Sequence, residues 1–240
     1  MPSLYSNRGA KRAREARAAL TDDPAAPLEC VLAVAEEAME TPVIVAELPE
    51  AIAGACCRSA SGAVVWVNGA HGLPRRRFTL AHELGHLWIG HEVGVEVDDI
   101  QTLKGTTTNP LEIEANAFAA AFLVPAAGLR ERVNGSPSLD DVVILAADYG
   151  VSAIMLTYRL KQLELASPQR IRRLEEEIAE DLHRQAYERL EPPTPEDGLS
   201  RINELPYLSP ALDGSLLDAA LKGDAAVDRS TGAAIDRLMR

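Results

Sequence analysis

The sequence predicts an α+β fold, in which a small sheet packs on a helical core and a mostly helical C-terminal extension follows. Three observations indicate this class. Short β-rich runs divided by Pro and Gly occupy residues 43–48, 54–60 and 63–68, as expected for neighbouring strands. Helical periodicity and capping residues fill most of the remaining chain. The chain has 240 residues and is 47% hydrophobic, enough apolar material to bury a core.

Composition divides the chain into three segments. Residues 1–26 hold a basic helix, and residues 27–166 hold the strands and most of the histidines. Residues 167–240 form the extension, with a Pro-rich linker near 191–200. We therefore expect one main domain of about 140 residues between two appendages.

Capping and breaking residues place the individual elements. The three β-rich runs are expected to form an antiparallel sheet, and the polar stretch after residue 90 is expected to hold one more strand. The expected helices lie at residues 6–20, 27–40 and 110–124, on both sides of Gly150, at 168–190, and on both sides of Gly223.

Charge and cysteine content exclude several classes of protein. The formal net charge is −12, which argues against direct binding to nucleic acid, because that affinity comes mainly from Lys and Arg. The basic residues of the 6–20 helix are expected to face solvent or an acidic partner. The three cysteines have no disulfide or metal-site spacing. No signal region or membrane-length apolar run is present, so we expect a cytoplasmic protein.

The stretch FTLAHELGHLWIGHE, residues 78–92, holds an H-E-x-x-H motif. Residues four apart lie on one face of a helix, so His82 and His86 can reach one ion while Glu83 lies beside them as a base. The residues between them are apolar or small, which predicts a buried helix with one polar stripe. Burying these groups without partners would cost several kcal/mol. A metal supplies the partner better than the alternative, a helix of core histidines.

A catalytic zinc ion requires a third protein ligand. His91 and Glu92 follow the motif, but the glycine that a metzincin needs is misplaced. Glu112 and Glu114 lie on the predicted helix 110–124 and point to nearly opposite sides. Because Glu114 shares its side with apolar residues, we expect it to be the ligand. Glu112 is the alternative, and zinc or manganese suits either set.

The sequence also offers candidates for contacts to the substrate or transition state. An oxyanion donor is required, and the candidates are Tyr158, Tyr149, His71 and His91. Arg77, in the basic run before the motif, could contact an acidic substrate segment. The run AVVWVN, residues 63–68, lies just before the motif helix and is a candidate edge strand for an extended substrate.

These blocks resemble the ImmA/IrrE family of metallopeptidases. The resemblance rests on RRRFTLAHELGHLWIGH, on EIEANAFAAAFLVP and on YGVSAIMLTYRLKQL, and covers about residues 27–165. It implies a zincin-like core with His82, His86 and Glu114 as zinc ligands and Glu83 as the catalytic residue. It also implies a zinc endopeptidase whose protein substrate is a helix-turn-helix repressor, on a mobile element or in a stress response.

Two other functions are compatible with the same residues. One is a toxin-like or signalling peptidase that a cognate regulatory protein restrains. The other is a non-catalytic metal-binding interaction module. The intact Glu83 argues against the second, because a module that only binds zinc needs no base there. The chain lacks an N-terminal helix-turn-helix domain, and residues 167–240 match nothing in the family pattern.

Overall fold

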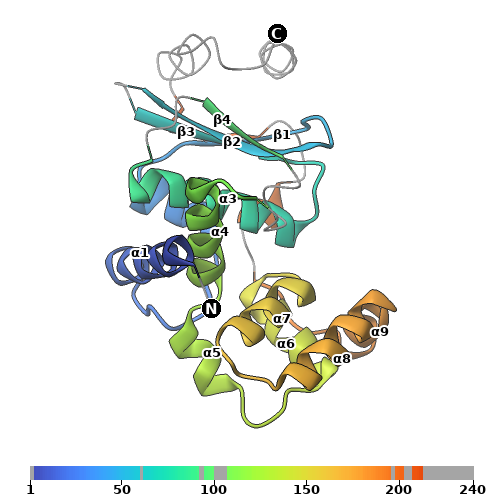
Figure 1. Ribbon diagram of the computed structural model, residues 1–240. Helices are drawn as coiled ribbons and strands as arrows, with labels where there is room; N and C mark the ends of the chain where they lie inside the picture. Colours follow the sequence, from blue (N-terminus) through green and yellow to red (C-terminus); the bar gives the residue numbers. More distant parts are fainter. Residues whose placement is uncertain are drawn as a thin grey trace.

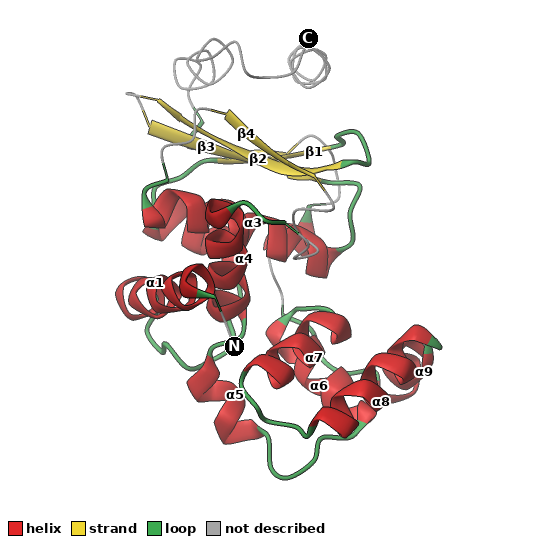
Figure 2. Cartoon of the chain, in the orientation of Figure 1, coloured by secondary structure: helices red, strands yellow, loops and turns green. Residues whose placement is uncertain are grey.

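The structure is a computed structural model that describes residues 3–59, 62–91, 95–99, 107–195, 198–202 and 207–212. Figure 1 shows three levels: a sheet, a layer of helices directly beneath it, and a separate group of helices at the other end. The described helices all lie on one side of the sheet (Figure 2). The predicted α+β class, a small sheet packed on a helical core, is confirmed.

The sheet holds five strands in the order β4-β2-β3-β1-β5. Their bounds are Val43–Ala46 for β1, Ile52–Ser59 for β2, Gly62–Asn68 for β3, Val95–Asp99 for β4 and Tyr207–Leu208 for β5. The three predicted runs and the fourth strand are confirmed. The prediction of an antiparallel sheet is wrong in one pairing, because β1 runs parallel to β3 while β2 and β3 are antiparallel.

The interior position of β3 overturns another expectation. Strands β2 and β3 pair with each other, and β1 then adds to the free side of β3. Residues Val64–Asn68 are consequently buried without alternation, as is typical of a central strand. An extended substrate therefore cannot pair with β3, and among the described strands the outer positions belong to β4 and β5.

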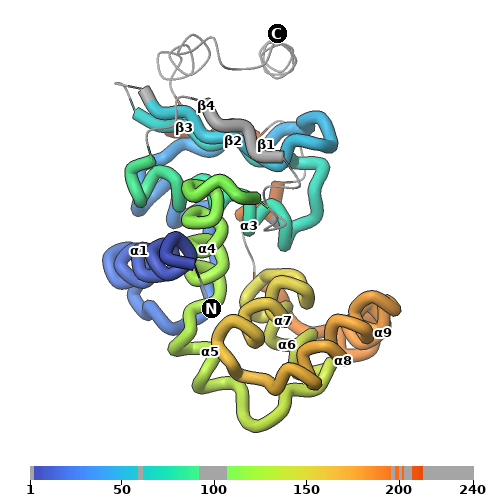
Figure 3. Tube along the Cα trace, viewed as in Figure 1, coloured from blue at the N-terminus to red at the C-terminus, as the bar shows by residue number. Residues whose placement is uncertain are grey.

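Two helices that are far apart in sequence pack closely beneath the sheet. The basic helix α1 (Leu4–Leu20) lies beside α4 (Pro110–Leu123), and Figure 3 shows the two tubes adjacent to each other. Gly9 permits this approach, because a Cβ there would lie 2.1 Å from the Glu114 carbonyl oxygen. Near the other end, Arg17 donates to the Phe122 carbonyl oxygen over 2.6 Å. The helix is confirmed, but Arg17 faces the core and not solvent.

Other buried arginines join segments in the same way, by donating to main-chain carbonyls of segments distant in sequence. Arg159 donates to Val124 after α4 over 2.8 Å, and Arg77 donates to Leu28 over 2.7 Å and to Tyr149 over 3.3 Å. Carbonyl groups at helix C-termini have no partner within the helix. Burial lowers the pKa of Arg159 to about 10, so it keeps its charge at neutral pH.

The helix expected at 27–40 is shorter and partly π-helical. It consists of a single turn, α2 (Val31–Ala33), which continues as a π-helix over Val34–Ala38. The Cys30 Sγ accepts a hydrogen bond from the Ala33 N–H at its start. Glu40 has a positive φ of 49° just after it, so the helix cannot continue past this residue.

The C-terminal helices pack as a group on the far side of α4 (Figure 1). They are α5 (Ala126–Arg132), α6 (Leu139–Tyr149), α7 (Ala153–Gln162), α8 (Pro168–Ala179) and α9 (Leu182–Leu190). The predicted break at Gly150 is confirmed, with φ of 64°. The single helix predicted over 168–190 is wrong, because Asp181 adopts a left-handed φ of 62° between α8 and α9.

Parts of the predicted extension contact the main domain. Strand β5 pairs with β1, and the short helix α10 (Gly198–Arg201) places Leu199 in the core. The helices predicted around Gly223 lie outside the described residues. No single helix of the described part is long and apolar enough to cross a membrane, although the bent pair α4 and α5 reaches that composition when taken together.

Candidate metal centre

Helix α3 (Leu73–Ile89) carries the H-E-x-x-H motif and is buried along most of its length. Pro74 stands in its first turn, and Gly90 ends it with a left-handed φ of 81°, which is the usual pair of start and stop signals. The side chains of His82, Glu83 and His86 are all fully buried. The predicted polar stripe on an otherwise apolar helix is therefore present.

Helix α4 supplies the third member of the cluster from its first turn. Asn109 caps this helix by accepting from the Leu111 N–H over 3.1 Å, which holds Glu112 at the end nearest α3. The Glu112 Oε2 lies 3.1 Å from the His82 Nε2, and its Oε1 lies 3.5 Å from the His86 Nε2. The two Nε2 atoms are 3.0 Å apart. One candidate ligand atom from each residue thus converges on one point.

These separations fit a metal ion. In a tetrahedral zinc site with bonds of about 2.0–2.1 Å, the ligand atoms lie about 3.3 Å apart. The three distances from 3.0 to 3.5 Å bracket that value. Two imidazole nitrogens and one carboxylate are also the donor set that suits zinc or manganese.

The outer nitrogens of the two histidines show why a cation belongs between the inner ones. His82 Nδ1 lies 3.1 Å from Asn116 Oδ1, and His86 Nδ1 lies 2.9 Å from His91 Nδ1. An amide oxygen only accepts, so the His82 proton resides on Nδ1 and its Nε2 presents a lone pair. The Glu112 carboxylate faces the two histidines, with its oxygens 3.1 Å from the His82 Nε2 and 3.5 Å from the His86 Nε2. Acceptors that face one another require a cation.

The expectation that Glu114 completes the set does not agree with this geometry. Its Oε2 lies 3.3 Å from His91 Nε2 and its Oε1 lies 2.8 Å from Arg8 Nε. Both Glu112 and Glu114 are buried, since α4 is enclosed on the α3 side and on the α1 side. Burial could therefore not identify the ligand, and the α3 side belongs to Glu112.

Glu83 lies where α3 faces the sheet. A Cβ added to Gly54 of β2 would lie 3.2 Å from the Glu83 Oε1, so the small residue at this position leaves room for the carboxylate. Glu83 is fully buried between the two histidines in sequence. Its carboxylate is therefore held inside the molecule, on the sheet side of the helix that carries His82 and His86.

Of the other predicted contact residues, only His91 reaches the cluster. Arg77 is buried and donates to main-chain carbonyls. His71 precedes the start of α3 at Leu73, which lies about 14 Å along the helix from His82 at 1.5 Å per residue. Tyr149 and Tyr158 belong to α6 and α7, beyond the C-terminal end of α4. Glu92 lies outside the described residues.

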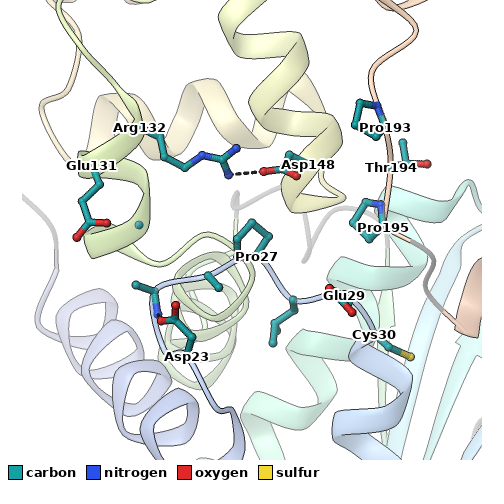
Figure 4. Close-up of a pocket in the computed structure, with 14 residues that line it drawn as sticks. Asp23, Pro27, Glu29, Cys30, Glu131, Arg132, Asp148, Pro193, Thr194 and Pro195 are labelled. Atoms are coloured by element: carbon teal, nitrogen blue, oxygen red, sulfur yellow. Dashed lines mark hydrogen bonds and ion pairs between the residues drawn. The ribbon is translucent and has the colours of Figure 1, made fainter.

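A large cavity exists away from the cluster. It has a volume of about 810 Å³ and is lined by the 23–30 loop, the end of α5, Asp148 and the Pro193–Pro195 segment. Figure 4 shows the Arg132–Asp148 ion pair at this cavity. None of the three candidate ligands lines it, so it is not the active site.

Sequence reasoning missed two contacts. Asn116 fixes the tautomer of His82, and Arg8 reaches Glu114 from a helix more than 100 residues away in sequence. The spacing of Glu112 and Asn116, four apart on α4, was a usable signal. Their polar stripe matches the polar stripe of α3.

Comparison with known proteins agrees with the site. Residues 43–161 match the family model Peptidase_M78, described as the IrrE N-terminal-like domain. This range includes α3, α4 and all three candidate ligands, and it begins after α1. A comparison with curated proteins gave no match.

Proposed function

The chain belongs to the IrrE N-terminal-like peptidase family through residues 43–161, and on that premise we propose that it is a zinc-dependent endopeptidase of the H-E-x-x-H type. The observation that carries the proposal is the convergence of His82, His86 and Glu112, with ligand atoms 3.0 to 3.5 Å apart. Glu83 lies in the same buried helix turn.

The three ligands would hold the ion, and Glu83 would move the proton. A bound zinc ion supplies Lewis acidity, which polarises a carbonyl and brings the pKa of water toward about 7. Glu83 accepts the proton of the attacking water and passes it to the leaving amine. Its full burial in the helix that carries two of the ligands supports that role. Manganese is compatible with the same ligands.

The proposed substrate is a helix-turn-helix repressor in the cytoplasm, in a mobile-element or stress response. The resemblance of the two motif blocks to ImmA/IrrE peptidases supports this choice of substrate. The acidic chain favours a protein substrate over direct contact with nucleic acid. The alternative is a peptidase that such a regulatory protein restrains.

The test compares wild type with Glu83→Gln, using the helix-turn-helix protein encoded nearest to this chain as substrate. We expect wild type to cleave it and Glu83→Gln to be slower by about 10²- to 10⁴-fold, with equal metal content by elemental analysis. Binding that inhibits cleavage of other proteins would favour the restrained peptidase. A zinc-loaded wild type that cleaves neither this protein nor an unfolded protein would contradict the peptidase proposal.

A further inference from the structure

Glu114 and His91 are buried polar residues that peptide hydrolysis does not use directly. Glu114 is 1% exposed and His91 is 6% exposed, so each needs a polar partner. His91 Nδ1 lies 2.9 Å from His86 Nδ1, and His91 Nε2 lies 3.3 Å from Glu114 Oε2. Arg8 Nε lies 2.8 Å from Glu114 Oε1. The four side chains therefore form an unbroken line from the metal cluster to the exposed face of α1.

One assignment of protons satisfies every contact in this line. His86 turns Nε2 toward the cluster, so it donates from Nδ1 to the Nδ1 of His91. His91 then donates from Nε2 to Glu114 Oε2, and the other carboxylate oxygen, Oε1, forms an ion pair with Arg8. Both imidazoles are neutral in this assignment.

A series of polar contacts of this kind fixes the orientation of a metal-ligating histidine. A metal-ligating histidine commonly donates its second N–H to a carboxylate, which fixes the ring and raises its basicity, and losing that partner typically costs 10- to 100-fold in metal affinity. Here the carboxylate acts through one further imidazole. Glu114 is consequently a positioning residue for His86, whereas Glu112 is a ligand.

Arg8, the residue of this series farthest from the metal cluster, belongs to a helix that the family match does not include. The match begins at residue 43, and Arg8 belongs to α1. Close packing at Gly9 against the main chain of Glu114 brings Arg8 to the carboxylate. The Arg8 side chain is 60% exposed, so its place in the line depends on how α1 docks and not on burial of the arginine itself.

We propose that Arg8, Glu114 and His91 act in series to position the metal ligand His86. Helix α1 is thereby part of the metal site. This inference rests on the proposed metallopeptidase site. It makes the N-terminal helix a determinant of metal affinity: displacing Arg8 removes the cation that holds the Glu114 carboxylate toward His91.

The test is zinc affinity by competition with a chromophoric chelator, for the full chain and four variants. We expect Glu114→Gln to raise the zinc Kd about 10- to 100-fold and Arg8→Ala to raise it by a smaller factor. Lys11→Ala is the matched control, because Lys11 is another exposed cation of α1 and its ion pair, among the described residues, is with Glu15 of the same helix. It should leave the Kd within about twofold of wild type.

Cobalt absorption spectra separate a positioning role from direct ligation. Glu114→Gln should keep the wild-type band shape at saturating cobalt, because the ligand set is intact. Glu112→Gln should change the band shape or abolish binding. The double variant Arg8→Ala with Glu114→Gln should bind no more weakly than Glu114→Gln alone, because the two act in one line.

Three results would overturn the inference. The first is a Kd within twofold of wild type for both Glu114→Gln and Arg8→Ala. The second is a cobalt spectrum of Glu114→Gln that changes as that of Glu112→Gln does, which would make Glu114 a ligand. The third is an equal loss in Lys11→Ala. Failure of wild type to bind zinc would instead contradict the proposed function, and Arg8→Ala remains decisive if Glu114→Gln does not fold.

Discussion

The helices around the metal cluster and the C-terminal group α6 to α9 differ in where their polar side chains lie. Helix α8 is a conventional surface helix: Ile171, Leu174 and Ile178 face the core at spacings of three and four, and charged residues cover the rest. Helix α3 is buried on most sides and keeps its polar residues inside. The first arrangement is stable through apolar contact alone, whereas the second requires a partner for each polar group.

The source of the polar partners differs in the same way. In the C-terminal group the caps at the helix starts are local: Ser138, Ser152 and Ser167 each accept a hydrogen bond from a main-chain N–H three residues on. At the metal cluster the partners come from other elements, since His82 meets Asn116 and Glu114 meets Arg8. The metal cluster therefore depends on tertiary packing, whereas the caps of the C-terminal helices do not.

The largest expected difference between the two regions comes from a matched pair of core truncations. Leu84 in α3 and Leu174 in α8 are both fully buried, so each change to Ala should cost about 2–5 kcal/mol of unfolding free energy. Only Leu84→Ala should also weaken zinc binding, because its helix carries the ligands. Urea unfolding and zinc titration measure the two effects. Equal loss of zinc affinity in Leu174→Ala would show that the regions are not separable.

Removing the metal should destabilise the helices around the metal cluster more than the C-terminal helices. At free zinc about one hundred times the Kd, binding adds about 2.7 kcal/mol to the unfolding free energy. Hydrogen exchange with and without a chelator should show this loss mainly in α3 and α4. Comparable loss of protection in α8 and α9 would indicate that the metal stabilises the whole molecule cooperatively.

The smallest expected effect concerns the capping box of α6. Ser138 and Asp141 exchange hydrogen bonds there, and Ser138→Ala should cost about 1 kcal/mol without changing zinc affinity. Hydrogen bonds from the Ser138 hydroxyl and backbone lower the pKa of Asp141. A lowered carboxyl pKa adds stability above the unfolded value of about 3.9 and loses it as pH falls further.

The stability difference between wild type and Ser138→Ala should therefore be constant between about pH 5 and 8 and shrink below about pH 4. Thermal unfolding across this range measures it. A difference that persists at low pH would mean that the serine hydroxyl, and not the ionised carboxylate, supplies the cap.

Local patterns predicted the elements well where their partners are local. The strands at 43–48, 54–60 and 63–68, the helix 110–124 and the break at Gly150 all appear in the structure. The break at Asp181 did not follow from the pattern, because no glycine or proline marks it. The interior position of β3 did not follow either, because strand order depends on which side of the hairpin accepts β1.

The part of the candidate site that lies within one helix could likewise be predicted from the sequence, and the part that depends on tertiary packing could not. His82 and His86 follow from a spacing within one helix, so geometry alone brings their Nε2 atoms together. The choice between Glu112 and Glu114 depends on which side of α4 meets α3 and which meets α1. That is a tertiary fact, and the apolar neighbours of Glu114 on its own side of α4 pointed to Glu114 instead. The contact from Arg8 is tertiary too.

The most direct test of the central claim is anomalous diffraction at the zinc edge from crystals of the zinc-loaded chain. The account predicts one strong peak about 2.0–2.2 Å from His82 Nε2, His86 Nε2 and a Glu112 oxygen, with Glu114 hydrogen-bonded to His91 behind it. A peak coordinated by Glu114 in place of Glu112, or no peak between the two histidines, would contradict it.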